Sequence, residues 1–438
     1  MSGRTGAPRE GSPVTSVRFA CHGCGAAIDA LRALPFRCPG TVVGDDVDHV
    51  LVPDDEARFA LRDDPDPFQR FRGWLSPYQA ARAAGLPDAA WDDIVGRLDE
   101  ALAAVDGCGF RVTPMTAEPA LASAAGVRGT LWVKDETRNV AGSHKARHLM
   151  GVMLYLRVIE AARLPIAQGL ATRPLAIASC GNAALAAAVI ARAADWPLAA
   201  FIPPDADTAV VARLRELGVR IVVCERRPNE VGDPCFLRFR AAVDAGALPF
   251  GVQGSENGLA IEGGRTLAFE MAEAFAAAGA LPEAVYVQVG GGALASAVAQ
   301  GFALAAAAGV IGHVPPLFAV QTAGCAPLAR AWERFGADPD GAARHRSRCM
   351  WPWETTPASL AHGILDDETY DWLEIVRAMQ ATGGRPLVVD EDVVARAFLL
   401  AQQHTSIRAS ATGTAGLAGV VAVPPAGPAA VICSGVER

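Results

Sequence analysis

The sequence lacks several features that would place it in a specialised class of protein. Its 39 basic residues form no run of Lys and Arg of the kind that marks a nucleic-acid-binding face, and the formal net charge is −8. The first residues, Met1–Arg4, lead into polar sequence without the apolar core of a secretory signal. No internal repeat and no extended low-complexity linker is present. We therefore expect no nucleic-acid partner and a cytoplasmic location.

Uninterrupted apolar segments and a disulfide pattern are missing as well. The alanine-rich run from Ala284 to Val314 is broken by Gln288, Gln300 and glycines, so it predicts a buried strand and helix and no membrane span. The ten cysteines lie mostly inside apolar stretches, which fits a reducing compartment better than a disulfide framework. With 438 residues, 51% of them hydrophobic, the chain is long enough for two or three domains.

One lysine lies where a strand is expected to give way to a helix. Residues 131–134 predict a short buried strand, and residues 146–159 carry apolar side chains at helical spacing, so Lys145 precedes the helix directly. A helix N-terminus offers free N–H groups and a positive dipole end, which suit an anionic ligand and lower the pKa of an amine. Taken alone, such a lysine is more often a solvated residue of the first helical turn. Lys145 is nevertheless a candidate for a Schiff-base nucleophile.

Two loops further along the chain carry the groups that such a lysine requires. Residues 176–184 run from an apolar strand through Ser179, Cys180, Gly181 and Asn182 into an alanine-rich helix, an arrangement that suits a carboxylate. Residues 285–294 form a second strand that ends in three glycines before a helix, which allows backbone amides to close around a phosphate. Each loop alone is common in α/β folds, but their order behind Lys145 favours a shared site.

These segments resemble the second fold type of pyridoxal-phosphate enzymes. That family includes serine and threonine dehydratases, threonine synthase, cysteine synthase and the tryptophan synthase β subunit. The resemblance covers roughly residues 60–438 in the expected order. The matching segments are Thr113–Met115, Lys134–Glu136, Asn139, Gly142–Arg147, Ser179–Asn182, Gly290–Leu294 and Val431–Gly435.

The resemblance implies an α/β protein with two open, mainly parallel α/β/α domains of the tryptophan synthase β-like fold. A zinc-ribbon-like segment would occupy residues 1–58, a large cofactor-binding domain residues 59–170 and 259–438, and a small mobile domain residues 171–258. Strands are expected at 131–134, 175–178, 198–202, 220–224, 285–289, 317–321 and 429–433. Helices are expected at 89–105 and 207–217, and an irregular surface segment at 338–356. Family habit suggests a homodimer.

The resemblance also implies roles for individual residues. Lys145 would hold pyridoxal phosphate as a Schiff base and then remove the α-proton of the substrate. Asn182 would bind the ring hydroxyl of the cofactor and Ser434 its ring nitrogen, where a neutral hydroxyl favours β-elimination over transamination. The phosphate would be bound by Gly290, Gly291, Gly292, Ala293 and Leu294. The amino-acid substrate would be bound by Ser143, Ser179, Cys180, Gly181 and Ala183. Residues 322–325 and 361–364 are expected to line the pocket for the β-substituent.

The reaction implied is the β-elimination, with deamination, of a small β-substituted amino acid such as serine or threonine. An alternative is threonine synthase or another replacement enzyme of the same fold. A phosphorylated substrate would then be bound by Arg138, Arg147, His148 and Arg265. An alternative of another class is a catalytically silent homologue that binds pyridoxal phosphate. His144 is expected to pack against the ring rather than transfer protons, and Glu270 to be either a cation ligand or a polar-face residue of a helix.

The N-terminal segment carries a separate metal-binding pattern. Cys21 and Cys24, followed by Cys38, have the knuckle spacing of a zinc ribbon, and some threonine synthases carry a similar ribbon. The fourth cysteine is missing, since Thr41 stands where it would be expected. Either zinc is bound structurally by the three cysteines and a fourth ligand, or the segment is vestigial and its thiols are free. The candidates for the fourth ligand are Asp45, Asp46, Asp48 and His49.

Overall fold

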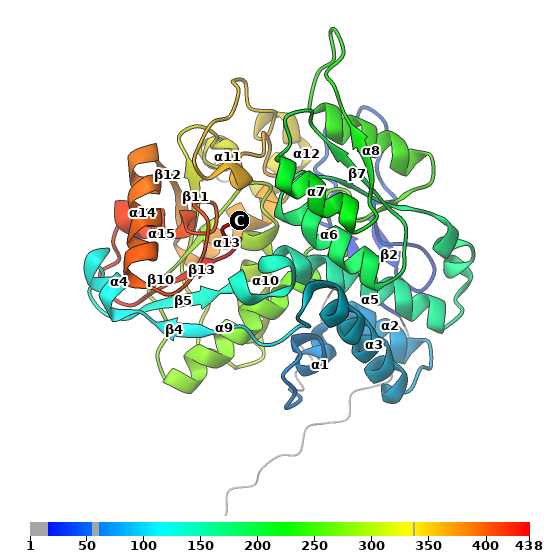
Figure 1. Ribbon diagram of the computed structural model, residues 1–438, viewed down its shortest axis with the longest axis horizontal. Helices are drawn as coiled ribbons and strands as arrows, with labels where there is room; N and C mark the ends of the chain where they lie inside the picture. Colours follow the sequence, from blue (N-terminus) through cyan, green and yellow to red (C-terminus); the bar gives the residue numbers. More distant parts are fainter. Residues whose placement is uncertain (1–15, 55–60, 336–337) are drawn as a thin grey trace, which may run out of the picture.

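The computed structural model describes residues 16–54, 61–335 and 338–438 and contains three sheets (Figure 1). The first is a small antiparallel sheet near the N-terminus with the order β2-β1-β3. Its strands are β1 (Arg18–Cys21), β2 (Ala27–Asp29) and β3 (Leu51–Pro53). The boundary expected between residues 58 and 59 lies outside the described residues.

The largest sheet has six strands in the order β12-β11-β10-β13-β5-β4. All neighbours are parallel except β4, which pairs antiparallel with β5 at one edge. Every residue of the central strands β10 and β13 is buried, as expected where helices cover both faces of a parallel sheet. The strands are β4 (Met115–Ala117), β5 (Leu131–Asp135), β10 (Ala284–Gln288), β11 (Leu317–Thr322), β12 (Arg385–Val389) and β13 (Ala429–Cys433).

Alternating side chains of β10 point to opposite faces of this sheet, each packed against its own helices. Val285 and Val287 lie in a core with α9 (Arg265–Ala278), α10 (Ala293–Ala307) and α13 (Trp372–Thr382). Ala284 and Tyr286 lie in a second core on the other face. The helices of that second core are α4 (Pro119–Ala124), α14 (Glu391–His404) and α15 (Ala415–Ala422).

The third sheet comprises four parallel strands in the order β8-β7-β6-β9. They are β6 (Leu175–Ala178), β7 (Leu198–Ile202), β8 (Arg220–Val223) and β9 (Leu248–Pro249). Helix α6 (Asn182–Ala193) packs on this sheet and also contacts α3 (Asp88–Asp106) and α5 (Lys145–Ala161), while α8 (Pro234–Asp244) packs against β6 and β7. The remaining helices are α1 (Pro67–Arg70), α2 (Ser76–Ala83), α7 (Thr208–Glu216), α11 (Pro327–Phe335) and α12 (Pro339–Arg344).

The expected strands and helices are present, with ends that differ by at most two residues from those of the structure. The expectation of an irregular segment at 338–356 is wrong in part. Helix α12 and a 3-10 turn at Arg346–Arg348 occupy it, and Arg346 pairs with Asp48 of the N-terminal segment at 3.1 Å. This part of the chain therefore packs against the N-terminal segment. In the described part of the chain, no helix is both long and apolar enough to cross a membrane.

Candidate functional site

Lys145 is the first residue of α5 and follows a turn with an unusual backbone conformation. Ala141 and Gly142 in this turn have φ angles of 55° and 67°, and a side-chain carbon on Gly142 would lie 2.5 Å from Cγ1 of Val436. Burial lowers the pKa of the Lys145 amine from its ordinary value of 10.5, and nearby Asp366 and Asp371 oppose this shift. A lowered pKa increases the fraction of free amine, the form that attacks a carbonyl.

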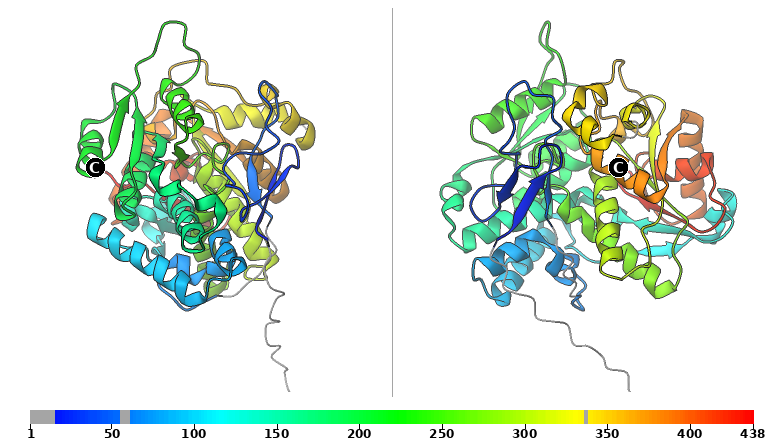
Figure 2. Two further views of the ribbon diagram at one scale, coloured as in Figure 1. Left: turned by 90° about the vertical axis from the view of Figure 1, so that its right-hand side faces the viewer. Right: turned by 180° about the vertical axis from the view of Figure 1, so that it is seen from behind.

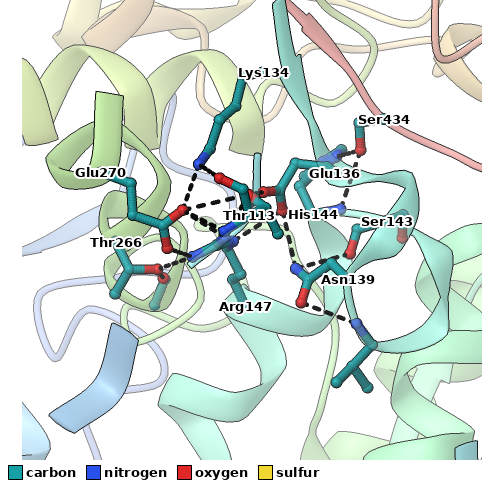
Figure 3. A network of polar contacts seen from close by, with 12 residues as sticks. Thr113, Lys134, Glu136, Asn139, Ser143, His144, Arg147, Thr266, Glu270 and Ser434 are labelled. Atoms are coloured by element: carbon teal, nitrogen blue, oxygen red, sulfur yellow. Dashed lines mark hydrogen bonds and ion pairs between the residues drawn. The ribbon is translucent and has the colours of Figure 1, made fainter. Parts of the chain in front are cut away.

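The first turn of α5 is anchored by a buried network of charges (Figure 3). Arg147 donates from Nε to Glu136 at 2.8 Å and from Nη1 to Glu270 at 2.6 Å. Lys134, the only other lysine of the sequence, donates to Glu270 at 2.5 Å, and Thr113 donates to Glu136. The four charged side chains are at most 1% exposed. Glu270 is thus an ion-pair partner in the interior, and Lys145 is the one lysine outside this network.

This burial corrects the expectation that four basic residues could bind a phosphorylated substrate. Arg147 is committed to the network, Arg265 is buried and donates to Gln300 at 2.9 Å, and the His148 ring is buried with Nδ1 2.7 Å from the carbonyl of Ala260. Nε2 of His148 has no hydrogen-bond partner within the described residues, but burial lowers the pKa of this ring to about 3, so it is neutral. None of the three residues therefore presents an exposed positive charge to a phosphorylated substrate. Arg138 is exposed and lies 3.5 Å from Asp135.

The glycine loop between β10 and α10 already binds an anionic oxygen. The Gly291 N–H donates to Oδ2 of Asp366 at 2.7 Å, and a side-chain carbon on Gly290 would lie 2.4 Å from the same oxygen. Gly292 has a φ of 98°, which favours glycine. Ala293 and Leu294 begin α10, so their N–H groups belong to a helix N-terminus. The Asp366 carboxylate occupies the kind of position in which this loop would bind a phosphate oxygen.

The loop after β6 lies at the N-terminus of α6. The Gly181 N–H donates to Oγ of Ser179 at 3.4 Å, and Cys180 between them is partly buried. Burial raises the pKa of the Cys180 thiol, and Asp205, Asp233 and Asp366 raise it further, so the thiol is neutral at pH 7. Asn182 and Ala183 are the first two residues of the helix.

Arg438 connects the loop after β6 with the turn before Lys145. Its Nη1 donates to Oδ1 of Asn182 at 2.6 Å, and its Nη2 donates to the carbonyl of Ala141 at 2.7 Å. A side-chain carbon on Gly435 would lie 2.7 Å from Nδ2 of Asn182. Asn182 therefore lies beside the end of β13, as its expected role beside Ser434 requires.

Ser434 follows β13 and lies against the residue before Lys145. Its Oγ accepts the backbone N–H of His144 at 3.0 Å and lies 2.5 Å from Nδ1 of the His144 ring (Figure 3). Burial and the charge of Lys145 lower the pKa of His144 well below its usual value, so the ring is neutral. His144 also packs edge-to-face on His148, with 5.6 Å between ring centroids. In the structure His144 therefore contacts His148 and Ser434, and its expected packing against the cofactor ring stays a prediction.

Two buried polar atoms in the two residues just before Lys145 lack hydrogen-bond partners within the described ranges. They are Oγ of Ser143 and Nε2 of His144. Buried polar groups are normally satisfied, so an unpaired pair beside a reactive amine is typical of a ligand site.

Asp366 and Asp371 are site residues that the sequence analysis missed. Asp366 connects the glycine loop with the segment at 361–364, and its carbonyl accepts from Sγ of Cys325 at 3.2 Å. The two segments expected to line a substrate pocket, 322–325 and 361–364, therefore lie together beside the glycine loop. The signal in the sequence was the acidic run Asp366–Glu368 directly after the second segment.

Lys145, the loops after β6 and β10, and Ser434 all lie at carboxyl ends of strands or at helix N-termini, which is where open α/β sheets bind ligands. This fold and site define an α/β enzyme with a buried amine, an anion-binding loop and unpaired polar atoms. The glycine loop that accommodates an anion and the free-amine character of Lys145 fit the phosphate and the aldehyde of pyridoxal phosphate.

Comparisons with known proteins agree with this definition. The family model described as pyridoxal-phosphate dependent enzyme matches residues 109–435. The chain therefore belongs to this family, its fold is the expected tryptophan synthase β-like fold, and its cofactor is pyridoxal phosphate. A search of curated proteins found no match.

Three solved structures illustrate the shared fold. Serine racemase from maize has a TM-score of 0.57 at 18% identity, covering 78% of this chain and 93% of that one. The processed form of threonine deaminase isoform 2 from Solanum lycopersicum has a TM-score of 0.58 at 16% identity, covering 81% and 92%. Diaminopropionate ammonia lyase from Escherichia coli has a TM-score of 0.57 at 17% identity, covering 80% and 89%. At these identities the likeness shows the fold alone.

Proposed function

We propose that this enzyme is a lyase that catalyses the β-elimination, with deamination, of a small β-substituted amino acid such as serine or threonine. The observation that carries the proposal is the buried Lys145 amine with its lowered pKa, at the N-terminus of a helix and beside an anion-binding glycine loop. Lys145 would hold the cofactor through its amine and would act as the base at the substrate α-carbon.

In this proposal the residues around Lys145 bind and orient the cofactor and the substrate. The bound cofactor supplies an electron sink for the α-carbon. The amides of residues 290–294 would hold its phosphate in place of the Asp366 carboxylate that Gly291 binds in the structure, and Asn182 would bind its ring hydroxyl. Ser434, whose Oγ accepts the N–H of His144, would form a hydrogen bond with the ring nitrogen. A neutral hydroxyl in this position leaves the ring nitrogen largely unprotonated, which favours elimination.

The proton and bond changes balance in a simple way. Lys145 takes the proton from the α-carbon, and the bond from the β-carbon to its substituent breaks, with the electron pair leaving on that substituent. A hydroxyl substituent takes up a proton and departs as water. The unsaturated amine that is released then reacts with water to give a keto acid and ammonia.

The loop at 179–183 and the unpaired hydroxyl of Ser143 support binding of the substrate carboxylate. The state of the basic residues considered for a phosphorylated substrate argues against one. Arg147 and Arg265 are buried and donate to other side chains, and the buried His148 ring is neutral because burial lowers its pKa to about 3. Threonine synthase activity is therefore the weaker alternative.

The test is an absorbance and product assay on the purified holoenzyme. The substrates are serine, threonine, 2,3-diaminopropionate, O-acetylserine and O-phosphohomoserine, with detection of keto acid and ammonia. We expect keto acid and ammonia in equal amounts from the wild type and none from Lys145→Ala, whose fold is checked by circular dichroism. Product that forms only after addition of a second nucleophile would identify a replacement enzyme. A spectrum that responds to no amino acid would identify a silent homologue.

A further inference from the structure

Three cysteines and one histidine converge at the edge of the N-terminal sheet, far from Lys145 in the sequence. Cys21 ends β1, Cys24 lies in the turn that follows, Cys38 lies in the segment after β2, and His49 precedes β3. One ligand atom from each residue lies within 4.8 Å of all the others. Sγ of Cys21 is 3.5 Å from Nδ1 of His49, and Sγ of Cys24 is 3.5 Å from Sγ of Cys38.

These distances match the edges of a zinc tetrahedron. Zinc–sulfur bonds of about 2.3 Å and zinc–nitrogen bonds of about 2.0 Å place two sulfur ligands about 3.8 Å apart, and a sulfur and a nitrogen about 3.5 Å apart. A disulfide would instead bring two sulfur atoms to about 2.05 Å. The three cysteines are free thiols in the structure. The Cys21–His49 and Cys24–Cys38 distances are thus close to tetrahedral edges, and all four ligand atoms lie near enough together to surround one ion.

The backbone around the cysteines is shaped for thiolates. The Cys21 N–H donates to the carbonyl of Ala26 at 2.8 Å, which closes the tight turn that contains Cys24, and Gly25 in this turn has a φ of 76°. The Ala26 N–H points to Sγ of Cys24 at 3.5 Å, and the Gly40 N–H points to Sγ of Cys38 at 3.3 Å. N–H donors aimed at sulfur stabilise the deprotonated ligand.

The structure also distinguishes among the four candidates for the last ligand. Asp45 accepts a hydrogen bond from Nε2 of His49 at 3.0 Å, which leaves Nδ1 without a proton and facing the sulfurs. A carboxylate behind a histidine ligand is a common arrangement at zinc sites. Asp46 instead accepts from the side chain of Ser347 at 2.8 Å, and Asp48 pairs with Arg346. His49 is thus the candidate whose free ligand atom faces the cysteines.

We propose that Cys21, Cys24, Cys38 and His49 bind one zinc ion in a closed, structural site. Four protein ligands leave no coordination position for a substrate, so the ion has no part in the reaction at Lys145. The proposal is independent of the proposed reaction.

The ion would stabilise the N-terminal segment, which contacts α5, α13 and Glu256. His22, beside Cys21, pairs with Glu374 of α13, and the carbonyl of Ala30 accepts from the hydroxyl of Tyr155 on α5. Arg37, beside Cys38, donates to Glu256 at 2.9 Å. In Figure 2 this N-terminal sheet, in blue, lies on the face of the molecule turned away from the viewer of Figure 1. Loss of zinc would therefore loosen the contacts of this segment with α5, α13 and Glu256.

The experiment measures bound metal on the full-length holoenzyme purified without added metal or chelator. We expect about one zinc per chain in the wild type and a strong loss in Cys24→Ser and His49→Ala. The matched controls are Cys108→Ser, a half-buried cysteine elsewhere, and His404→Gln at the end of α14; both should retain the full amount. Asp45→Asn, which spares all four ligands, should weaken zinc affinity by about 10- to 100-fold.

A second measurement keeps the test decisive if the ligand variants fail to fold. Replacement of zinc by cobalt(II) in the wild type should give the intense visible absorption of a tetrahedral site and a thiolate-to-cobalt band in the near ultraviolet. Absence of both zinc and cobalt uptake in the folded wild type would overturn the proposal. Iron in place of zinc would overturn the assigned metal, and equal zinc content in His49→Ala and wild type would overturn the assigned ligand.

Discussion

The substitution Glu270→Gln tests the buried charge network that anchors α5. Glu270 accepts from Lys134 at 2.5 Å, from Arg147 at 2.6 and 3.1 Å, and from the backbone N–H of Thr113 at 3.1 Å. With Glu136, the network holds two positive and two negative side chains, and all four are at most 1% exposed. Glutamine keeps the shape of the side chain but removes one negative charge and turns an amide donor toward existing donors. The network then carries an uncompensated positive charge in the protein interior.

The expected loss of unfolding free energy in Glu270→Gln follows from the burial of the charge network. Removing one partner of a buried ion pair costs about 3–5 kcal/mol, because the remaining charge stays desolvated without its partner. Typical proteins unfold with a free energy of only about 5–15 kcal/mol, so the variant should lose a large share of its stability. Glu273→Gln is the matched control on the same helix. Its carboxylate pairs with Arg70 at 2.8 Å but is 21% exposed, so its loss should cost about 0–1 kcal/mol.

The assay is urea unfolding of the holoenzyme, followed by circular dichroism and by cofactor absorbance. The double variant Lys134→Met/Glu270→Gln restores the balance of charges, and we expect it to be more stable than the sum of the two single variants implies. The reasoning is refuted if Glu270→Gln shifts the urea midpoint no more than Glu273→Gln does. It is also refuted if the effects of the two single substitutions are additive.

Three further predictions concern the ligand loops and their pH dependence. Gly290→Ala should abolish uptake of pyridoxal phosphate by the apoenzyme in an absorbance titration, because the new carbon would lie 2.4 Å from Asp366 and 2.8 Å from the backbone of Ile364. Asp366→Asn should lower the Kd for pyridoxal phosphate by about tenfold or more, since a carboxylate no longer competes for Gly291; an unchanged or higher Kd in a fluorescence titration would contradict this. Burial raises the pKa of Asp371 from 3.8 to about 8, so this group favours the folded state fully below pH 3.8 and progressively less as the pH rises to 8. Asp371→Asn should therefore lose less thermal stability than the wild type between pH 5 and 8, and a parallel decline in both proteins would show that Asp371 is ionised across this range.

The sequence alone determined the fold and the order of the ligand-binding segments. Apolar runs such as residues 175–178 and 429–433, each followed by small or polar turn residues, are local patterns that fix a strand and the loop at its carboxyl end. The lysine segment, the loop at 179–183 and the glycine loop follow such strands, and this is why Lys145 and the residues for pyridoxal phosphate were recognisable from the sequence. A very short strand contains too few residues to show a recognisable apolar pattern, and for this reason the two-residue strand β9 was missed.

The tertiary structure decided which charged and polar side chains are available to ligands. In the sequence, Arg147, His148 and Arg265 look as suitable for binding a phosphorylated substrate as Arg138 does. The partners that commit them come from distant segments: Glu270 lies 123 residues from Arg147, and Ala260 lies 112 residues from His148. The choice of His49 among four candidates likewise required the approach of β3 to β1.

The contact of Asp366 with the glycine loop is the clearest case of a partner that the sequence does not reveal. Gly291 and Asp366 are 75 residues apart, and nothing in the periodicity of either segment records their contact. Local sequence encodes periodicity and turn chemistry, because these depend on neighbouring residues. The burial of a charge and the identity of its partner depend on which segments the folded chain brings together, and the tertiary structure alone supplies that information.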